Sequence, residues 1–162
     1  MKQEKNNEKT NVMRILEEAN KSYIPHFFDA NITDGQSISK SLNIEPERTF
    51  KTLVTIGNDL KYYVFVIPVI YSLDLKKAAK SVNVKNVEMI KQKELFPLTG
   101  YVHGGCSAIG MKKKFTTVID ELAQIFDTIC YSGGKLGTQV ETSPQDLAEL
   151  TNAKFADIVM SM

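Results

Sequence analysis

The sequence predicts an α+β fold with a mixed sheet that either stays open or closes into a barrel. Three observations lead to this class: short helical patterns alternate with β-branched and aromatic runs, Gly57-Asn-Asp59 joins two such runs as a hairpin turn, and no internal repeat is present. A length of 162 residues with 43% hydrophobic content favours one domain with one sizeable core.

The first half of the chain predicts two helices and three strands. Apolar residues recur on one helix face over residues 11–20, and Thr10 or Asn11 can cap this helix. The second helix is predicted at 37–42 and ends before Pro46. The strands are predicted at 23–28, 49–56 and 60–69, and the last two form the central hairpin.

The second half predicts shorter elements around two loops. Ser72 can cap a helix that extends through Ala79, and the segment Ser143-Pro-Gln-Asp146 begins a helix that ends near Asn152. Strands are predicted at 87–90, 116–119, 128–131 and 139–141. Helical turns are predicted at 91–95, a helical or irregular segment at 120–126, and a strand or helical turn at 155–159.

The composition is typical of a soluble, cytoplasmic protein. No apolar run approaches the roughly 18 residues that a membrane span needs. The polar residues 1–10 predict a flexible tail before a domain over residues 11–162. The two cysteines, Cys106 and Cys130, are too few for a secreted disulfide scaffold, so we expect reduced thiols, although their spacing does not exclude a disulfide.

The net charge is only +1, but the charges are unevenly distributed. Residues 1–50 hold 7 basic and 8 acidic side chains, residues 51–114 hold 11 and 4, and residues 115–162 hold 2 and 7. A polyanion such as RNA is attracted to a basic segment like the middle one. A solvated lysine face explains the same pattern without any partner.

Two glycine-rich segments, residues 100–110 and 131–137, hold most of the nine glycines. Glycine lets a ligand approach main-chain N–H and C=O groups closely, although tight turns are its ordinary use. Each segment also carries a serine beside its glycines, Ser107 in the first and Ser132 in the second. The two segments together predict a pocket that is formed partly by backbone groups.

Lys51 lies inside an apolar strand pattern. In the predicted strand, Phe50 and Val54 share one face, and Lys51 and Leu53 share the other. A fixed cation at this position suits a phosphate or a carbonyl oxygen. A lysine that extends its ammonium from the strand edge into solvent explains the pattern as well.

The sequence contains few side chains for conventional catalysis. Its histidines, His26 and His103, show no metal-ligand spacing with the cysteines, and no nucleotide-binding motif is present, so we expect neither a metal nor a cofactor. His103 could pair with Cys106 or Ser107 as base and nucleophile, but no third orienting group is evident. Cys106 is also explained as a small buried apolar residue.

Six motifs occur in order between residues 12 and 159: Phe50-Lys-Thr-Leu53, Asp74-Leu-Lys-Lys-Ala-Ala-Lys80, Val87-Glu-Met89, Gly100-Tyr-Val-His-Gly-Gly-Cys-Ser107, Tyr131-Ser-Gly-Gly-Lys135 and Ala153-Lys-Phe-Ala-Asp-Ile158. Together they resemble the YbaK/EbsC family of Cys-tRNA(Pro) deacylases, related to the editing domain of bacterial prolyl-tRNA synthetases. The resemblance implies a mixed barrel-like sheet flanked by helices, and hydrolysis of the ester that joins a mischarged amino acid to the tRNA 3′ end.

The resemblance also implies site residues. Lys51 corresponds to the family's strand lysine, Ser132 to its pocket serine, and Gly104 to the glycine whose carbonyl faces the substrate. Further substrate contacts are expected at Phe28, Thr52, Gly105, Ser107 and Gly133. Contacts with the tRNA backbone are expected at Lys112, Lys113, Lys114 and Lys135. Family proteins are thought to use the substrate's own cysteine thiol, which attacks the ester carbonyl and expels the tRNA.

The chain also departs from the family pattern. Ala108 stands where the family often has proline, Leu136 stands where it often has arginine, and the segment between His26 and Lys51 looks shorter than in the best-studied branch. Two alternatives therefore stay open: a deacylase for another small amino acid such as alanine, using a bound water, and a non-catalytic module that binds tRNA or a synthetase. Because a small domain offers little surface to recognise a whole tRNA, we expect prolyl-tRNA synthetase as a partner.

Overall fold

Short polar side chains set the start of most helices in the computed structural model, which describes residues 8–160. The side chain of Thr10 accepts a hydrogen bond from the N–H of Met13, and Ser143 accepts one from the N–H of Asp146. Both predicted caps are confirmed. Of the tail predicted at residues 1–10, residues 1–7 lie outside the described part of the chain.

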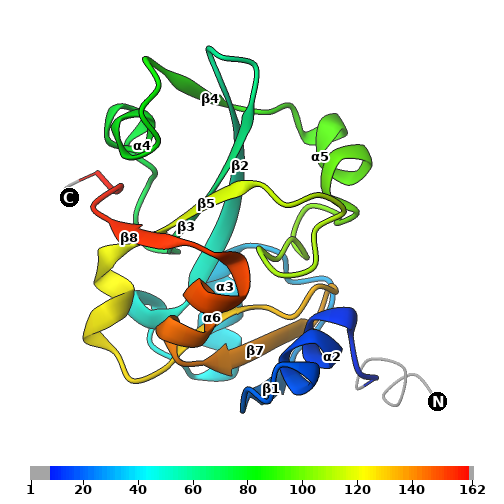
Figure 1. The fold of residues 1–162 in the computed structure, drawn as a ribbon. Helices are drawn as coiled ribbons and strands as arrows, with labels where there is room; N and C mark the ends of the chain where they lie inside the picture. The colour runs from blue at the N-terminus through cyan, green and yellow to red at the C-terminus, as the bar shows by residue number, and fades with distance from the viewer. Residues whose placement is uncertain (1–7, 161–162) are drawn as a thin grey trace.

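The described part of the chain contains five α-helices, two short 3₁₀ helices and eight strands (Figure 1). The helices are α2 (Asn11–Glu18), α3 (Gly35–Leu42), η1 (Pro46–Arg48), α4 (Leu75–Ser81), α5 (Gln92–Thr99), η2 (Glu121–Ile125) and α6 (Pro144–Thr151). The strands are β1 (Ile24–Phe27), β2 (Phe50–Gly57), β3 (Tyr62–Pro68), β4 (Val87–Met89), β5 (Thr116–Asp120), β6 (Ile129–Ser132), β7 (Thr138–Thr142) and β8 (Lys154–Ala156). Among residues 8–160, no helix has the length and apolar character to cross a membrane.

The larger sheet is mixed and has the strand order β4-β2-β3-β5-β8. β2 pairs antiparallel with β3 and β4, whereas β3 with β5 and β5 with β8 pair in parallel. In the β2–β3 hairpin, Lys51 lies opposite Ile67 and Leu53 lies opposite Phe65. The predicted α+β class, the mixed sheet and the central hairpin are therefore confirmed.

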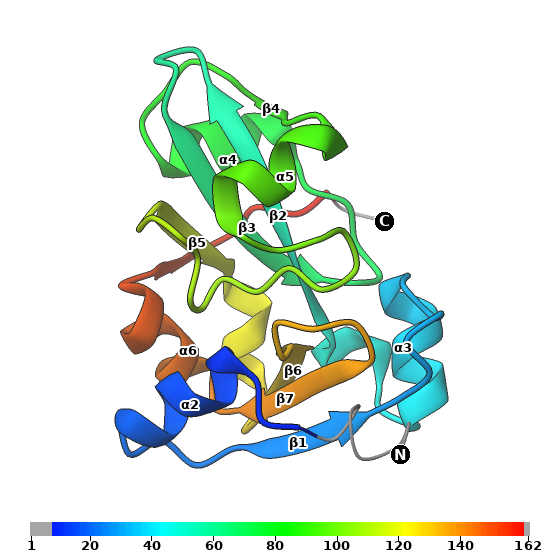
Figure 2. The ribbon, with the colours of Figure 1, turned by 90° about the vertical axis from the view of Figure 1, so that its right-hand side faces the viewer.

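The smaller sheet is antiparallel, has the order β1-β7-β6, and is linked to the larger sheet by one isolated backbone bridge among the described residues. There, Thr49 and Cys130 form an isolated parallel bridge. A barrel needs continuous pairing around the whole sheet, and no such closure joins β1 to β8 among the described strands. The sheet is therefore not a closed barrel, which was one of the two forms that the sequence allowed. Figure 2 shows the smaller sheet below the long β2–β3 hairpin.

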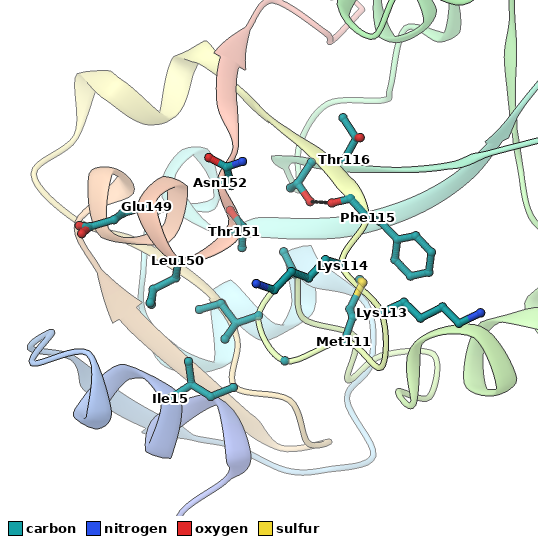
Figure 3. Close-up of a pocket in the computed structure, with 14 residues that line it drawn as sticks. Ile15, Met111, Lys113, Lys114, Phe115, Thr116, Glu149, Leu150, Thr151 and Asn152 are labelled. Carbon is teal, nitrogen blue, oxygen red and sulfur yellow. Dashed lines mark hydrogen bonds between the residues drawn. The ribbon is translucent and has the colours of Figure 1, made fainter. Parts of the chain in front are cut away.

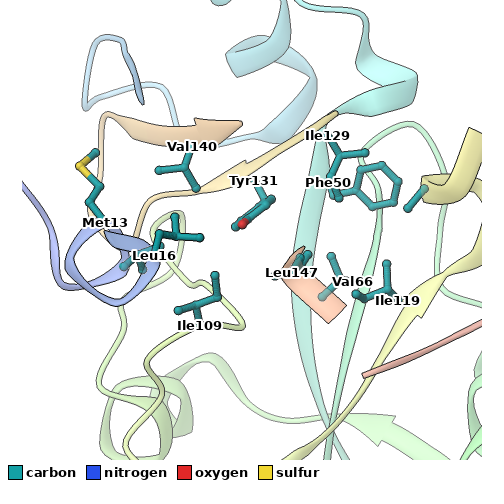
Figure 4. Close-up of a cluster of buried hydrophobic side chains, with 12 residues drawn as sticks. Met13, Leu16, Phe50, Val66, Ile109, Ile119, Ile129, Tyr131, Val140 and Leu147 are labelled. Atoms are coloured by element: carbon teal, nitrogen blue, oxygen red, sulfur yellow. The ribbon is translucent and has the colours of Figure 1, made fainter. Parts of the chain in front are cut away.

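The main core lies where the two sheets face each other beside α2 and α6. Tyr131 of β6 is at its centre and is 1% exposed (Figure 4). The side chains around it come from both sheets and both helices, and include Leu16, Phe50, Val140 and Leu147. This core holds the start of β2 against β6, which matters because both strands carry predicted site residues.

The helices α4 and α5 differ from their predicted bounds for local reasons, and the bounds of α2 and α3 differ by two residues. Asp74, rather than Ser72, caps α4, because its carboxylate accepts the N–H groups of Lys76 and Lys77. Helix α5 continues past Pro97 to Thr99 and ends at Gly100, whose φ of 85° suits a glycine and whose N–H bonds the carbonyl of Phe96.

Most strands begin one or two residues from the predicted start, and β3 and β8 show the reasons. β3 begins at Tyr62 instead of residue 60, because Leu60 has a φ of 66° and Asp59 accepts the N–H of Lys61, so the turn is longer. The last strand lies at Lys154–Ala156, one residue before the predicted start, and beyond it Val159 forms a single bridge with Leu73.

Candidate functional site

The bridge between the two sheets places Lys51 and Ser132 side by side. Thr49 and Cys130 pair in parallel, and Lys51 and Ser132 each lie two residues further along their strands. Since side chains alternate between the faces of a strand, Lys51 and Ser132 point to the same side as the bridged pair. This side is opposite to Phe50 and Tyr131, which point into the main core.

The ammonium of Lys51 is half-buried and unpaired. Burial lowers the pKa of Lys51 below its ordinary value of 10.5, and no carboxylate among residues 8–160 lies within ion-pair or hydrogen-bond distance of its Nζ. A charge held in this way is stabilised by an anionic ligand or a ligand oxygen. Its environment therefore suits Lys51 to bind a substrate oxygen.

The two glycine-rich loops contact each other beside this strand pair. Gly104 has a φ of 90°, and a Cβ built on it would lie 3.1 Å from side-chain atoms of both Leu136 and Thr33. A Cβ on Gly105 would lie 3.2 Å from the backbone nitrogen of Leu136. Both the conformation and the close approach exclude larger residues here without movement of a neighbour. The loops that the sequence singled out thus form one structure.

The second loop turns at Ser132, whose Oγ accepts the N–H of Gly134 at 3.0 Å. This arrangement leaves the hydroxyl hydrogen of Ser132 available to a ligand. Gly133 uses its own N–H within the loop, where it donates to the carbonyl of Thr138 at 2.9 Å. Ser132 is therefore better placed than the Gly133 amide to bind a substrate.

The remaining predicted substrate contacts are more dispersed. Phe28 is half-buried, and its N–H donates to the carbonyl of Gly137 at 3.0 Å, so it borders the second loop. Thr52 lies on the opposite face of β2 from Lys51. Ser107 is 0% exposed and accepts the N–H of Ile109, so its hydroxyl supports the first loop from inside. Substrate contacts by these three residues stay predictions.

Gln139 is a further candidate site residue, which the sequence did not indicate. It lies directly opposite Ser132 in the β6–β7 ladder, and side chains of such a pair share a face. Gln139 is 5% exposed, and its Oε1 has no hydrogen-bond donor among the described residues. Buried acceptors are nearly always bonded, so this oxygen is suited to a donor on a ligand. A glutamine in a short strand has no pattern that distinguishes it beforehand.

The predicted lysine triplet divides between two places. Lys112 packs along Gly100, with its Nζ 5.3 Å from the ring centre of Phe96. Lys113 and Lys114 line a separate groove of about 610 Å³ between α2, α6 and β5, and Figure 3 shows their side chains pointing in opposite directions. Lys135 lines a third place, a groove beside the second glycine loop. Contacts of these lysines with tRNA stay predictions.

A second group of polar side chains, around Glu141, lies on the same face of β6 and β7 as Ser132 and Gln139. Glu141 accepts hydrogen bonds from Arg48 at 3.1 Å and from Thr128, and its Oε1 lies 2.8 Å from Nε2 of His26. Burial acts to raise the pKa of Glu141, but these bonds outweigh it and lower the pKa below its ordinary value. His26, Cys130 and Glu141 are close enough to hold a metal ion, but the Arg48 guanidinium already neutralises the carboxylate.

The thiols are poorly suited to nucleophilic attack. Burial raises the pKa of both Cys106 and Cys130 to about 12, which leaves them protonated at neutral pH. Within residues 8–160, His103 is exposed and makes no hydrogen bond with Cys106 or Ser107. The geometry therefore does not form the dyad that the sequence left open.

A sequence model of the aminoacyl-tRNA editing domain family matches residues 29–150, which include both glycine loops and Lys51. This chain belongs to the aminoacyl-tRNA editing family. The editing domain is 45% identical over 160 residues to a protein of Enterococcus faecalis (strain ATCC 700802 / V583) provisionally named Cys-tRNA(Pro)/Cys-tRNA(Cys) deacylase EbsC, with 98% of each chain covered. The resemblance read from the six motifs is thus confirmed.

Solved structures share the fold of the editing domain. The hypothetical protein APE2540 matches with a TM-score of 0.86 at 22% identity, covering 93% of this chain and 100% of that one. A protein provisionally described as a trans-editing enzyme for prolyl-tRNA synthetase matches with a TM-score of 0.80 at 22% identity, covering 94% and 99%. At this identity the likeness concerns the fold.

Proposed function

We propose that this editing domain is a freestanding deacylase that hydrolyses mischarged Cys-tRNA(Pro). The observation that carries the proposal is the half-buried, unpaired ammonium of Lys51 beside Ser132, where the two glycine loops meet. The name of the Enterococcus faecalis relative, which is 45% identical over nearly the whole chain, supports the same substrate.

In the proposed reaction the substrate supplies its own nucleophile. The cysteine sulfur attacks the ester carbonyl carbon, an S–C bond forms, and the C–O bond to the tRNA 3′ oxygen breaks. The thiol proton goes to the leaving 3′ oxygen, and water then opens the cyclic thioester to release cysteine. Such an intramolecular attack has a high effective concentration, so the protein has mainly to orient the substrate and stabilise charge.

Each central residue has a role that its surroundings support. Lys51 stabilises the oxyanion that develops on the ester carbonyl, because its charge has no protein partner among the described residues. Ser132, the Gly104 carbonyl and Gln139 hold the substrate amine or thiol, since Gln139 retains a buried acceptor. The protein thiols take no part, because burial raises their pKa to about 12.

Two alternatives remain distinct from this proposal. A deacylase for Ala-tRNA(Pro) would use the same residues with a water as nucleophile, and a non-catalytic module would bind tRNA or a synthetase without hydrolysis. We infer a cytoplasmic protein that needs no cofactor and works beside prolyl-tRNA synthetase, with Lys112, Lys113, Lys114 and Lys135 near the tRNA backbone. The arrangement of these lysines in separate places favours several weak phosphate contacts over one continuous face.

Hydrolysis of Cys-tRNA(Pro), Ala-tRNA(Pro) and Ser-tRNA(Pro), with wild-type protein and with Lys51→Ala, tests the proposal. We expect loss of cysteine alone, dependent on Lys51. Loss of alanine would assign the site to a water-using deacylase. Absence of hydrolysis for all three substrates would favour the binding module.

A further inference from the structure

A groove of about 390 Å³ opens between the two glycine-rich loops. One wall comes from the first loop, with Tyr101 and Val102, and the other comes from Leu136 and Ala30. The hydroxyl of Tyr101 donates to the carbonyl of Ile109, which holds the ring in place. The volume of the groove lies within the roughly 300–1,000 Å³ range of small-molecule sites.

The groove adjoins the loop contact of the site proposed above at Leu136. Leu136 joins the two, because its side chain lines the groove and its backbone nitrogen would lie 3.2 Å from a Cβ on Gly105. Ser132 and Gly104 are each two residues from a groove residue, Gly134 and Val102. This edge of the loops is therefore the place where we expect the leaving group of a substrate bound at Lys51 and Gly104.

The lining of the groove combines an apolar surface with cations. Val102 is 47% exposed although it is apolar, and Leu136 and Ala30 are apolar as well. Lys135 lines the groove, and Lys112 packs along Gly100, another lining residue. A nucleotide matches this combination, because its flat base packs on apolar side chains and its phosphate pairs with a lysine.

We propose that this groove binds the terminal adenosine of the aminoacyl-tRNA, with the base between Val102 and Leu136 and the 5′ phosphate facing Lys135. The inference rests on the proposed function, since the adenosine carries the ester that the site would cleave. The groove of Figure 3 is a poorer candidate, because it contains Glu149 and no residue of the second glycine loop. Leu136, which replaces the arginine frequent in the family, then makes the adenosine site of this chain more apolar.

The experiment uses adenosine 5′-monophosphate as probe and Val102→Asp as variant. Val102 is exposed and its substitution leaves the core intact, and Ile125→Asp is the matched control, because Ile125 is 72% exposed and lies on η2, outside the groove. Amide NMR titrations with the nucleotide and with inorganic phosphate are combined with deacylation of Cys-tRNA(Pro) by each protein.

We expect the nucleotide, but not phosphate alone, to shift the amides of residues 100–102 and 134–136 in the wild type and in Ile125→Asp. Val102→Asp should lose these shifts and raise KM about tenfold or more with little change in kcat, as expected for loss of one base contact.

Unshifted loop amides, equal shifts with phosphate, or retained binding by Val102→Asp would overturn the adenosine site. These results leave the deacylase proposal standing if the wild type hydrolyses Cys-tRNA(Pro). Conversely, specific nucleotide binding by a protein without hydrolytic activity would support the groove and refute the deacylase.

Discussion

Arg48 and Lys51 are three residues apart and both are partly buried, yet their surroundings are opposite. Arg48 donates to Glu45 at 2.8 Å, to Glu141 at 3.1 Å and to Thr128 at 3.3 Å. No carboxylate among the described residues pairs with Lys51. The paired cation joins η1 to the smaller sheet, whereas the unpaired one retains its capacity to bind. The comparison indicates that partnership, more than burial, distinguishes the structural charge of Arg48 from the charge of Lys51, for which we propose a role in substrate binding.

The largest effect is expected from Lys51→Ala. Loss of one charge that stabilises an oxyanion costs about a hundredfold or more in rate, so single-turnover deacylation of Cys-tRNA(Pro) should fall by that order while the thermal midpoint is maintained. Lys61→Ala, at an exposed lysine in the β2–β3 turn, is the control. Equal rates for the two variants would remove Lys51 from the site.

A second test removes Glu141, one of the two carboxylates that pair with Arg48. Glu141→Gln removes the carboxylate that accepts from Arg48, and should reduce the free energy of unfolding by about 2 kcal/mol, because it leaves the partly buried guanidinium with only the exposed Glu45 as its anion. Glu149→Gln is the matched control, since Glu149 is 65% exposed in its ion pair with Lys21 and such pairs contribute little. Urea unfolding of both variants measures the difference. Similar losses would mean that burial of the Glu141 pair adds nothing.

A smaller loss of stability is expected from Gly104→Ala. The φ of 90° costs any L-residue about 1 kcal/mol or more, and the new methyl group would lie 3.1 Å from Leu136 and Thr33. Because the new methyl group also shifts the first loop relative to the second, the deacylation rate should fall by more than the loss of folded protein explains. Thermal unfolding measured beside single-turnover rates checks this, and a variant with unchanged activity would show that the loop contact is not needed for the site.

The pKa shifts of Glu141 and Lys51 should have opposite effects on the free energy of unfolding, which the pH dependence of stability can separate. The lowered pKa of Glu141 contributes stability that is present above the unfolded value of 4.5 and is lost as pH falls through the folded-state pKa. The lowered pKa of Lys51 is a penalty that is present at neutral pH and fades as pH rises from the folded-state pKa to 10.5.

Chemical unfolding of wild type, Glu141→Gln and Lys51→Met across pH measures both effects. The gap between wild type and Glu141→Gln should close in acid. Lys51→Met should be the more stable protein at neutral pH, and its advantage should disappear in alkali. A gap for Lys51→Met that does not change with pH would contradict an unpaired, half-buried ammonium.

Local sequence patterns predicted most elements of this fold to within a few residues. The caps at Thr10 and Ser143 were found because a capping side chain acts within three residues of its own position. The misplaced start of α4 has the same origin, since Ser72 and Asp74 both suit a cap and only the folded turn selects Asp74. Closure of the sheet could not be predicted, because it depends on which strand edges meet.

By itself, the sequence determined the α+β class, the central hairpin, both glycine loops and membership of the editing family. Only the tertiary structure decided that Lys51 lies beside Ser132, that Gln139 shares this face, and that Arg48 is paired with Glu141. The physical reason is distance along the chain. Periodicity and capping act over a few residues, whereas Lys51 and Ser132, like Arg48 and Glu141, are more than 80 residues apart. Their positions relative to each other are set by packing of the two sheets around Tyr131.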